Sequence, residues 1–337
     1  MRTQLLERAL NPRQDAGKGK QGCKVRTMQT SNALDPQSPQ ARAIYELAIP
    51  ATIIFALIFV IVTGAIIYAI LRFRGRAGEP DPKQIPGNRK VEIAWTIIPF
   101  LIVILLLVMT FSAMNRADPP PAPSPDLVVT GHQFWWQVDY PNSGVITANE
   151  IHIPTGKPLS VRLESKDVLH EFWVPELTRK MSNVPGQPNH IWIQADKAGT
   201  YIGQCSEFCG TQHAWMRILV VAEEPSKFEE WQRAQLQPGQ AATTDATAKG
   251  LAFFQTSTCI NCHAIRGVAG ADLRVAPDLT HVGSRKQLGA GILENSPANM
   301  RLWLKSPQHI KPGALMPDFN FTDEQLDQLS AYLSTLQ

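Results

Sequence analysis

Two long apolar segments constrain the fold more than any other feature of this 337-residue chain. One runs from Ile49 to Leu71 and the other from Ile93 to Met114, and neither holds a charged residue. A helix needs about 20 apolar residues to cross the hydrocarbon core of a bilayer, and the core of a signal peptide is shorter. We therefore expect a membrane protein with a hairpin of two transmembrane helices over residues 46–115.

Residues near the ends of these segments fit the same interpretation. Pro50 and Pro99 are expected near the helix starts, where a missing N–H costs least. The aromatic rings of Tyr45 and Trp95 suit the interfaces between lipid and water.

The loop between the two segments is basic, which predicts that it lies on the cytoplasmic side. Its basic residues are Arg72, Arg74, Arg76, Lys83, Arg89 and Lys90. Everything after Asn115 then lies on the outer side of the membrane. The chain as a whole has a formal net charge of only +3. This small charge, without a basic stripe in the folded part, argues against a nucleic-acid partner.

The first 27 residues conflict with this orientation because they carry seven Lys and Arg residues on a segment that would be exported. Two explanations are open. The basic tail crosses the membrane nevertheless, or the true start of the protein is Met28. We favour the second, because it leaves Arg42 as the one basic residue before the first apolar segment. Residues 1–45 are therefore treated as an N-terminal tail, and a lipoprotein role for Cys23 lacks the apolar stretch it would need.

The exported part divides by composition. Residues 116–125 are rich in proline and predict an extended spacer. Residues 126–222 hold short β-branched or alternating runs separated by Pro, Gly and Asn, which predicts a small Greek-key barrel or sandwich. Residues 223–246 are expected to form a linker with one short helix at Lys227–Gln235. Residues 247–337 have helical patterns, and the last helix follows a capping box at Thr322–Gln325.

The stretch from Cys205 to Met216 carries the strongest chemical signal. It places two thiols, an imidazole and a thioether within twelve residues, and these soft ligands suit copper. A mononuclear blue-copper site needs one cysteine, whereas two cysteines can bridge two copper ions. His170 is the best candidate for a second histidine, and the carbonyl of Glu207 is a further candidate. A disulfide and a zinc site with His213 stay open as alternatives, although neither explains Met216.

The C-x3-C-x3-H-x2-M loop, the upstream histidine and the two-helix anchor resemble subunit II of cytochrome c oxidase over roughly residues 30–222. The resemblance implies a β cupredoxin-like Greek-key barrel that holds a dinuclear copper centre, CuA. The implied copper ligands are His170, Cys205, Glu207 through its carbonyl, Cys209, His213 and Met216. The carboxylate of Glu207 would help to hold a Mg ion against subunit I.

Two further regions resemble this family. Glu92 matches a glutamate at the mouth of a proton channel in subunit I, although an acid at a helix N-terminus is also favoured by the helix dipole alone. Phe134, Trp135 and Trp136 match an aromatic stretch through which electrons enter. Many members have Trp at the position of Phe134, so the usual docking patch for soluble cytochrome c is in doubt. The alternative is that all three rings serve packing.

Cys259-Ile-Asn-Cys262-His263 is a CxxCH motif, which predicts covalent attachment of haem with His263 as the proximal ligand. Met316 is the expected sixth ligand, and a methionine there raises the haem potential. Met300 is a rival, but its surroundings favour core packing. The segment 276–281 makes residues 247–337 similar to class I cytochrome c, an all-α domain. A zinc site or a redox dithiol stays open.

The remaining histidines are expected to be surface or structural residues: His132, His152, His190, His281 and His309.

Together these resemblances imply a caa-type haem-copper oxidase. Electrons would pass from a reduced donor to haem c, to CuA and then to subunit I, where dioxygen is reduced to water with proton translocation. The implied partners are subunit I, subunit III, cytochrome c or a similar donor, and the lipid of a bacterial inner membrane. Two alternatives remain: the electron-entry subunit of a CuA-containing nitric oxide reductase, and a membrane-anchored copper-delivery protein, against which the haem motif argues.

Overall fold

The computed structural model describes residues 31–337 except 76–77, 79–83, 85 and 118–121. The basic tail, the proposed start at Met28 and Cys23 lie outside the described residues, as do Arg76 and Lys83 of the basic loop. The division of the chain into domains stays a prediction. Residues 127–223 are called the β domain and residues 245–337 the C-terminal domain.

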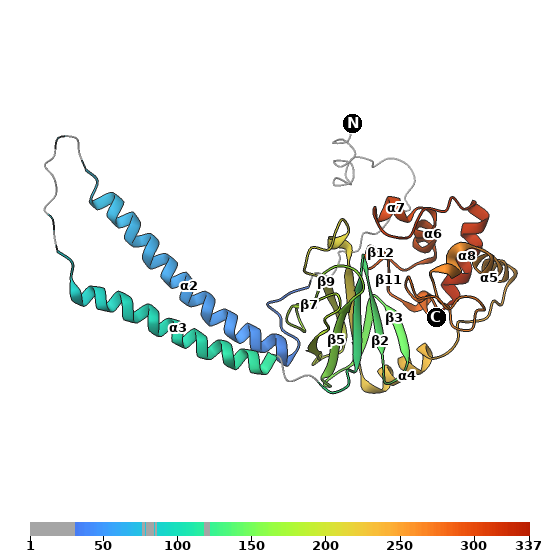
Figure 1. Cartoon of the computed structure of the whole chain (residues 1–337), viewed down its shortest axis with the longest axis horizontal. Coiled ribbons are helices and arrows are strands. Elements are labelled where there is room, and N and C mark those ends of the chain that lie inside the picture. The colour runs from blue at the N-terminus through green and yellow to red at the C-terminus, as the bar shows by residue number, and fades with distance from the viewer. Residues whose placement is uncertain (1–30, 76–77, 79–83, 85, 118–121) are drawn as a thin grey trace. The chain divides into compact units, whose positions relative to one another are not determined.

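Two helices, α2 (Pro39–Arg72) and α3 (Arg89–Ala117), pack against each other and are long and apolar enough to cross a membrane (Figure 1). The expectation for the two prolines was wrong, because Pro50 and Pro99 lie well inside these helices. Capping sets the helix starts instead. The Ser38 hydroxyl accepts the N–H of Ala41, and the Asn88 side chain accepts the N–H of Lys90.

The β domain is a sandwich of two five-stranded sheets, with strand orders β3-β2-β1-β5-β8 and β4-β10-β9-β6-β7. The pairs β1–β5 and β4–β10 are parallel, and the other neighbours are antiparallel. The strands are β1 Leu127–His132, β2 Trp135–Tyr140, β3 Val145–Ala148, β4 Glu150–Pro154, β5 Leu159–Ser165, β6 His170–Trp173, β7 Met181–Asn183, β8 Asn189–Ile193, β9 Gly199–Cys205 and β10 Arg217–Glu223. The inward residues form one apolar core, with Trp136 and Phe172 fully buried at its centre. The cupredoxin-like β architecture is therefore confirmed.

The helix expected at Lys227–Gln235 is present as α4 (Pro225–Gln235), which begins two residues earlier. Its Phe228 and Trp231 pack against the core of the β domain. The first half of the expected linker is therefore fixed to the sandwich by apolar contacts.

The C-terminal domain is helical as expected and also contains one hairpin of two-residue strands. Its elements are α5 Asp245–Thr256, η2 Thr258–Asn261, η3 Val282–Ser284, β11 Gln287–Leu288, β12 Leu293–Glu294, α6 Pro297–Lys305, α7 Pro307–Ile310 and α8 Asp323–Thr335. The capping box predicted at Thr322 and Gln325 begins α8. Helices α5 and α8 cross at Gly250, where a Cβ atom would collide with the carbonyl of Gln328. The small residue thus permits the close packing of these two helices.

Two of the leftover histidines are structural, as expected. The ring nitrogens of the buried His281 face the backbone carbonyls of Gln235 and Gln337. His152 stacks on Trp231 with ring centroids 4.1 Å apart, and its Nδ1 lies 3.1 Å from a carboxylate oxygen of Glu223. Burial disfavours the charged ring, but the carboxylates of Glu150 and Glu223 outweigh it and raise the pKa of His152.

This raised pKa predicts a pH-dependent contribution to stability. The contribution should be fully present below the unfolded-state pKa of about 6.5 and should disappear as the pH rises through the higher folded-state pKa. Thermal unfolding of the protein and of His152→Gln should therefore differ more at pH 5.5 than at pH 8.5. The exposed His309 offers a control, since His309→Gln should show no such trend. A constant difference across the pH range would contradict the prediction.

Candidate functional site

The second sheet brings the predicted metal ligands together through the pairing of β6 with β9. Phe172 stands opposite Cys205 in this antiparallel register, and His170 begins β6 two residues earlier on the same face. After Cys205 the chain turns back on itself, and the Cys205 N–H donates to the Met216 carbonyl over 3.0 Å. One strand pair and one closed loop therefore place both ends of the motif beside His170.

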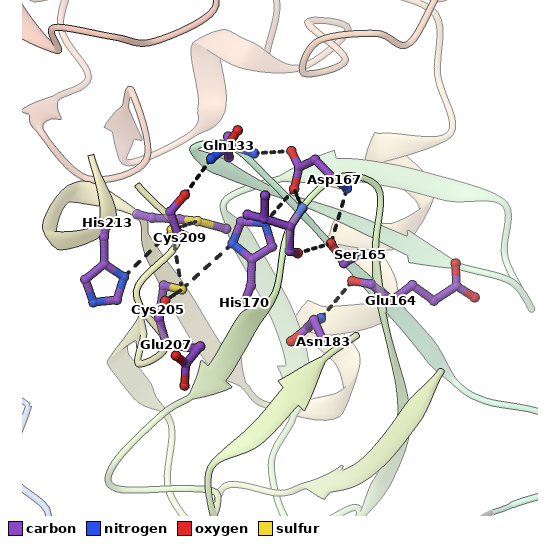
Figure 2. A network of polar contacts seen from close by, with 12 residues as sticks. Gln133, Glu164, Ser165, Asp167, His170, Asn183, Cys205, Glu207, Cys209 and His213 are labelled. Atoms are coloured by element: carbon purple, nitrogen blue, oxygen red, sulfur yellow. Dashed lines mark hydrogen bonds and ion pairs between the residues drawn. The ribbon is translucent and has the colours of Figure 1, made fainter. Parts of the chain in front are cut away.

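The two thiols lie at the centre of this cluster (Figure 2). Cys205 and Cys209 are both free and buried, and their sulfur atoms are 3.9 Å apart. The His170 Nδ1 lies 3.9 Å from the Cys205 sulfur, and the His213 Nδ1 lies 3.7 Å from the Cys209 sulfur. A disulfide bond needs sulfurs about 2 Å apart, so the pair is held open as two thiols.

Two weaker donors complete the cluster. The sulfur of Met216, which is fully buried, lies 3.8 Å from that of Cys209. The Glu207 carbonyl lies 3.2 Å from the Cys205 sulfur, while the Glu207 residue as a whole is exposed. All six residues predicted as ligands are therefore gathered in one place, and the groups of His170, Cys205 and Cys209 could hold a metal ion.

Hydrogen bonds to neighbouring side chains orient the cluster. The Nε2 of His170 lies 2.7 Å from a carboxylate oxygen of Asp167, which leaves Nδ1 directed at the sulfurs. The other carboxylate oxygen of Asp167 accepts the N–H of Gln133 over 2.6 Å. The Gln133 side chain in turn donates to the Cys209 carbonyl over 2.5 Å. Such partners of metal ligands fix the orientation of the ligand ring and raise its basicity.

Asp167 and Gln133 were not among the residues predicted to act at this site. The position of Asp167 three residues before His170 was a usable signal, because a carboxylate at that spacing can reach an imidazole at the start of a strand. Nothing in the sequence connects Gln133 with Cys209, because their contact depends on how β1 and the metal loop pack.

The thiols are electrostatically prepared for metal binding. Hydrogen bonds from Cys209 and His170 lower the pKa of Cys205 to about 4, against the opposing effect of burial. The shared proton correspondingly raises the pKa of Cys209. Metal binding needs both cysteines as thiolates, so a bound positive ion would displace their protons.

The predicted haem residues line a cavity of about 300 Å³ that the C-terminal domain forms together with part of the β domain. Cys259, Cys262 and His263 border it, and Met316 and Met300 contribute to its wall. The Nδ1 of His263 donates to the Pro277 carbonyl over 2.7 Å, because a carbonyl can only accept. Burial lowers the pKa of His263, so the ring is neutral and its Nε2 has a free lone pair. A mainly apolar cavity with two thiols and one such imidazole fits a haem.

Comparison with known proteins agrees with this geometry. Family models described as "Cytochrome C oxidase subunit II, transmembrane domain", "Cytochrome C oxidase subunit II, periplasmic domain" and "Cytochrome c" match residues 27–113, 144–223 and 247–337. Cytochrome c oxidase subunit 2 of Alkalihalophilus pseudofirmus is 36% identical over 313 residues, which cover 90% of each chain. The chain belongs to the cytochrome c oxidase subunit II family.

Other relatives have the same name. Cytochrome c oxidase subunit 2 of Bacillus sp. (strain PS3) is 35% identical over 79% of this chain and 80% of its own length. The crystal structure of the periplasmic domain of cytochrome oxidase subunit II from Bradyrhizobium japonicum is 31% identical. It covers 34% of this chain and 95% of that domain, with a TM-score of 0.32.

Membership of this family gives the two apolar helices their role as the membrane anchor and places the β domain on the outer face. The periplasmic and cytochrome c domains together imply copper and haem. They also imply a subunit I as partner and a donor of the cytochrome c type.

The three aromatic residues at positions 134–136 of this subunit II differ in how deeply they are buried. Trp136 is fully buried and packs edge-on against Phe172. Trp135 is half-buried and stacks on His132 with ring centroids 4.3 Å apart. Phe134 is buried and borders the haem cavity from the β domain. Packing thus explains Trp136, whereas Phe134 and Trp135 lie where the two candidate sites approach each other.

The remaining predicted site residue, Glu92, is exposed in the first turn of α3. This position suits both readings of the residue, a stabilised acid at a helix N-terminus and an acid facing a channel in subunit I.

The close packing around the His170 ring predicts that a larger side chain at Gly131 disturbs this ligand. A Cβ atom on Gly131 would lie 2.6 Å from the ring of His170, too close without movement of the ring. Gly131→Ala should therefore lower the copper affinity roughly 10-fold or more, as loss of ligand orientation does. Metal analysis after titration with a competing chelator measures this affinity. Gly199→Ala is the control, because its Cβ would make only ordinary contacts with Tyr201. Equal affinity in both variants would contradict the prediction.

Proposed function

We propose that this chain is the electron-entry subunit of a respiratory cytochrome c oxidase in a bacterial inner membrane. Its c haem would pass electrons to a dinuclear CuA centre and on to subunit I, where dioxygen is reduced to water with proton translocation. The observation that carries this proposal is the cluster of six donor groups, in which four surround the free thiols of Cys205 and Cys209.

The near-symmetry of the cluster supports two copper ions over one. Each thiol has one imidazole nitrogen beside it, His170 for Cys205 and His213 for Cys209. Each also has one weak donor nearby, a carbonyl in one case and the thioether of Met216 in the other. A single blue-copper ion binds one cysteine, two histidines and a weak methionine, so it would leave one buried thiolate of this set unused.

The protein's own part in this chemistry is to hold the donors in place. When bound, a copper pair held by Cys205 and Cys209 would accept and release one electron. Asp167 orients the imidazole of His170, and the buried Met216 and Trp136 keep water from the cluster. A rigid, dry set of ligands is what rapid electron transfer requires, because little then rearranges on reduction.

The C-terminal domain supports covalent haem c. Cys259 and Cys262 would form the two thioether bonds, His263 would be the proximal ligand and Met316 the sixth ligand. Met300 is nearly fully buried in the core of the domain, which favours its assignment to packing. Methionine ligation would give the haem a potential high enough to serve as a donor to copper.

The loop that holds the cysteines also supports a docking role toward subunit I. Phe208 is 75% exposed, and its neighbour Glu207 is exposed too. An exposed aromatic ring beside a carboxylate suits a protein partner, and the carboxylate could share a Mg ion with subunit I. Subunit III, bilayer lipid around α2 and α3, and a cytochrome c as donor complete the proposed set of partners.

Spectroscopy of the purified oxidase tests this proposal directly. We expect two copper ions in CuA and one covalent haem in this chain, with a mixed-valence copper signal in EPR beside a low-spin haem signal. Cys209→Ser should abolish the mixed-valence signal and leave the haem spectrum unchanged, because the haem residues lie in the other domain. Zinc, a single copper ion or a cystine at these positions in fully matured protein would overturn the proposal.

The axial ligands of the haem provide a second test. Met316→His should lower the haem reduction potential, because a methionine ligand raises it relative to histidine. Met300→Leu, a substitution of similar volume, should leave the potential nearly unchanged. Redox titration of the haem absorbance measures both. If Met300→Leu shifts the potential and Met316→His does not, the two methionines have been assigned in the wrong order.

A further inference from the structure

A buried lysine joins the two candidate electron-transfer domains. The side chain of Lys311 donates to the carbonyls of Phe134, Trp215 and Gly289, over 2.8, 2.8 and 2.7 Å. The first two carbonyls belong to the β domain and the third to the C-terminal domain. Lys311 itself is only 3% exposed. A lysine at such a depth is rare unless specific partners hold it there.

The three hydrogen bonds use every donor of the ammonium group. Among the described residues, no carboxylate lies within ion-pair distance of Lys311. Burial of the ammonium lowers the pKa of Lys311 to about 7, which reflects how completely the group is removed from water. The three backbone carbonyls, together with the nearby Cys209 thiol group, offset its desolvation, and two of the three carbonyls would be lost if the domains separated.

Other contacts surround this lysine. The Gln212 side chain donates to the Pro312 carbonyl over 2.7 Å, and the Arg217 N–H donates to the Ala290 carbonyl over 3.1 Å. Glycine permits a close approach here, because a Cβ atom on Gly313 would lie 2.7 Å from the Thr211 hydroxyl. Two loops of the C-terminal domain therefore fit closely against the metal loop of the β domain.

The short linker between the domains is also held in place. Helix α4 packs on the sandwich through Phe228 and Trp231. Within the following residues, the Gly239 N–H donates to the Arg266 carbonyl over 2.9 Å. A C-terminal domain that swings on a long free linker would show neither feature.

We infer that Lys311 is a docking residue. It fixes the loop of the C-terminal domain that ends in Met316 against the metal loop of the β domain, which ends in Met216. The purpose of this docking rests on the proposed function, since it gives the internal electron transfer one constant geometry. The haem would then stay in one position relative to the copper site, and only the external electron donor would have to diffuse. Lys311 lines the haem cavity but is not among the residues predicted to bind the copper or the haem, so we assign it a positioning role.

The intact oxidase with Lys311→Met tests this inference. Methionine keeps most of the apolar stem and removes all three donors. Pulsed EPR measures the distance distribution between the oxidised copper pair and the ferric haem, and rapid photoreduction of the haem gives the internal electron-transfer rate. We expect one narrow distance in the unmodified oxidase. In the variant we expect a broad distribution and a rate reduced roughly tenfold or more, because three buried hydrogen bonds are lost together.

Lys305→Met is the matched control, because Lys305 is an exposed lysine of the same domain, and it should change neither readout. Gln212→Leu removes a contact from the β-domain side and should broaden the distances less, so the test survives if Lys311→Met does not fold. Haem content and copper content should be unchanged in all three variants. Missing copper or haem in the unmodified oxidase would refute the proposed function. A broad distance in fully loaded oxidase, or a narrow one in folded Lys311→Met, would overturn the docking inference alone.

Discussion

The pairing of β6 with β9 is the interaction on which the candidate metal site depends. It fixes His170 and Cys205 on one face, with Phe172 opposite Cys205 in the register. A slip of one residue would turn the imidazole to the other face of the sheet and leave the thiols without it. The buried Phe172 and Trp136 oppose such a slip, because it would expose apolar surface that the sandwich now covers. The apolar core therefore determines the geometry of the metal ligands.

Short sequence patterns were enough to predict much of the candidate sites and of the fold. The metal loop and the CxxCH motif are compact, so their residues come together whatever the rest of the chain does. The apolar segments predicted the two helices but not where these begin, because apolar length reports the depth of the membrane while capping groups set the ends. Pro50 was misplaced for this reason: Ser38 and Pro39 start α2 more than two turns before the apolar run.

Contacts between distant segments could not be predicted in this way. Gln133 acts on the metal cluster only because separate loops meet there. Lys311 lies 177 positions from Phe134, to whose carbonyl it donates. A single lysine in a loop is typical of a solvent-exposed surface, and its neighbours in the sequence do not reveal the distant carbonyls to which it donates. Such residues become visible only when the packing of the two domains is known.

The carboxylate of Glu150 interacts with both His152 of the sandwich and the backbone of the C-terminal domain. Glu150 helps to raise the pKa of His152, and the same side chain accepts the backbone N–H of Lys286 in the C-terminal domain over 2.5 Å. His152 in turn stacks on Trp231 of α4, the helix that leads into that domain. Contact at Lys311 alone would leave the C-terminal domain free to rotate about one point. Because Glu150 and α4 hold it at separate places, the domain is constrained in orientation as well as in distance, and electron transfer between two fixed centres needs both.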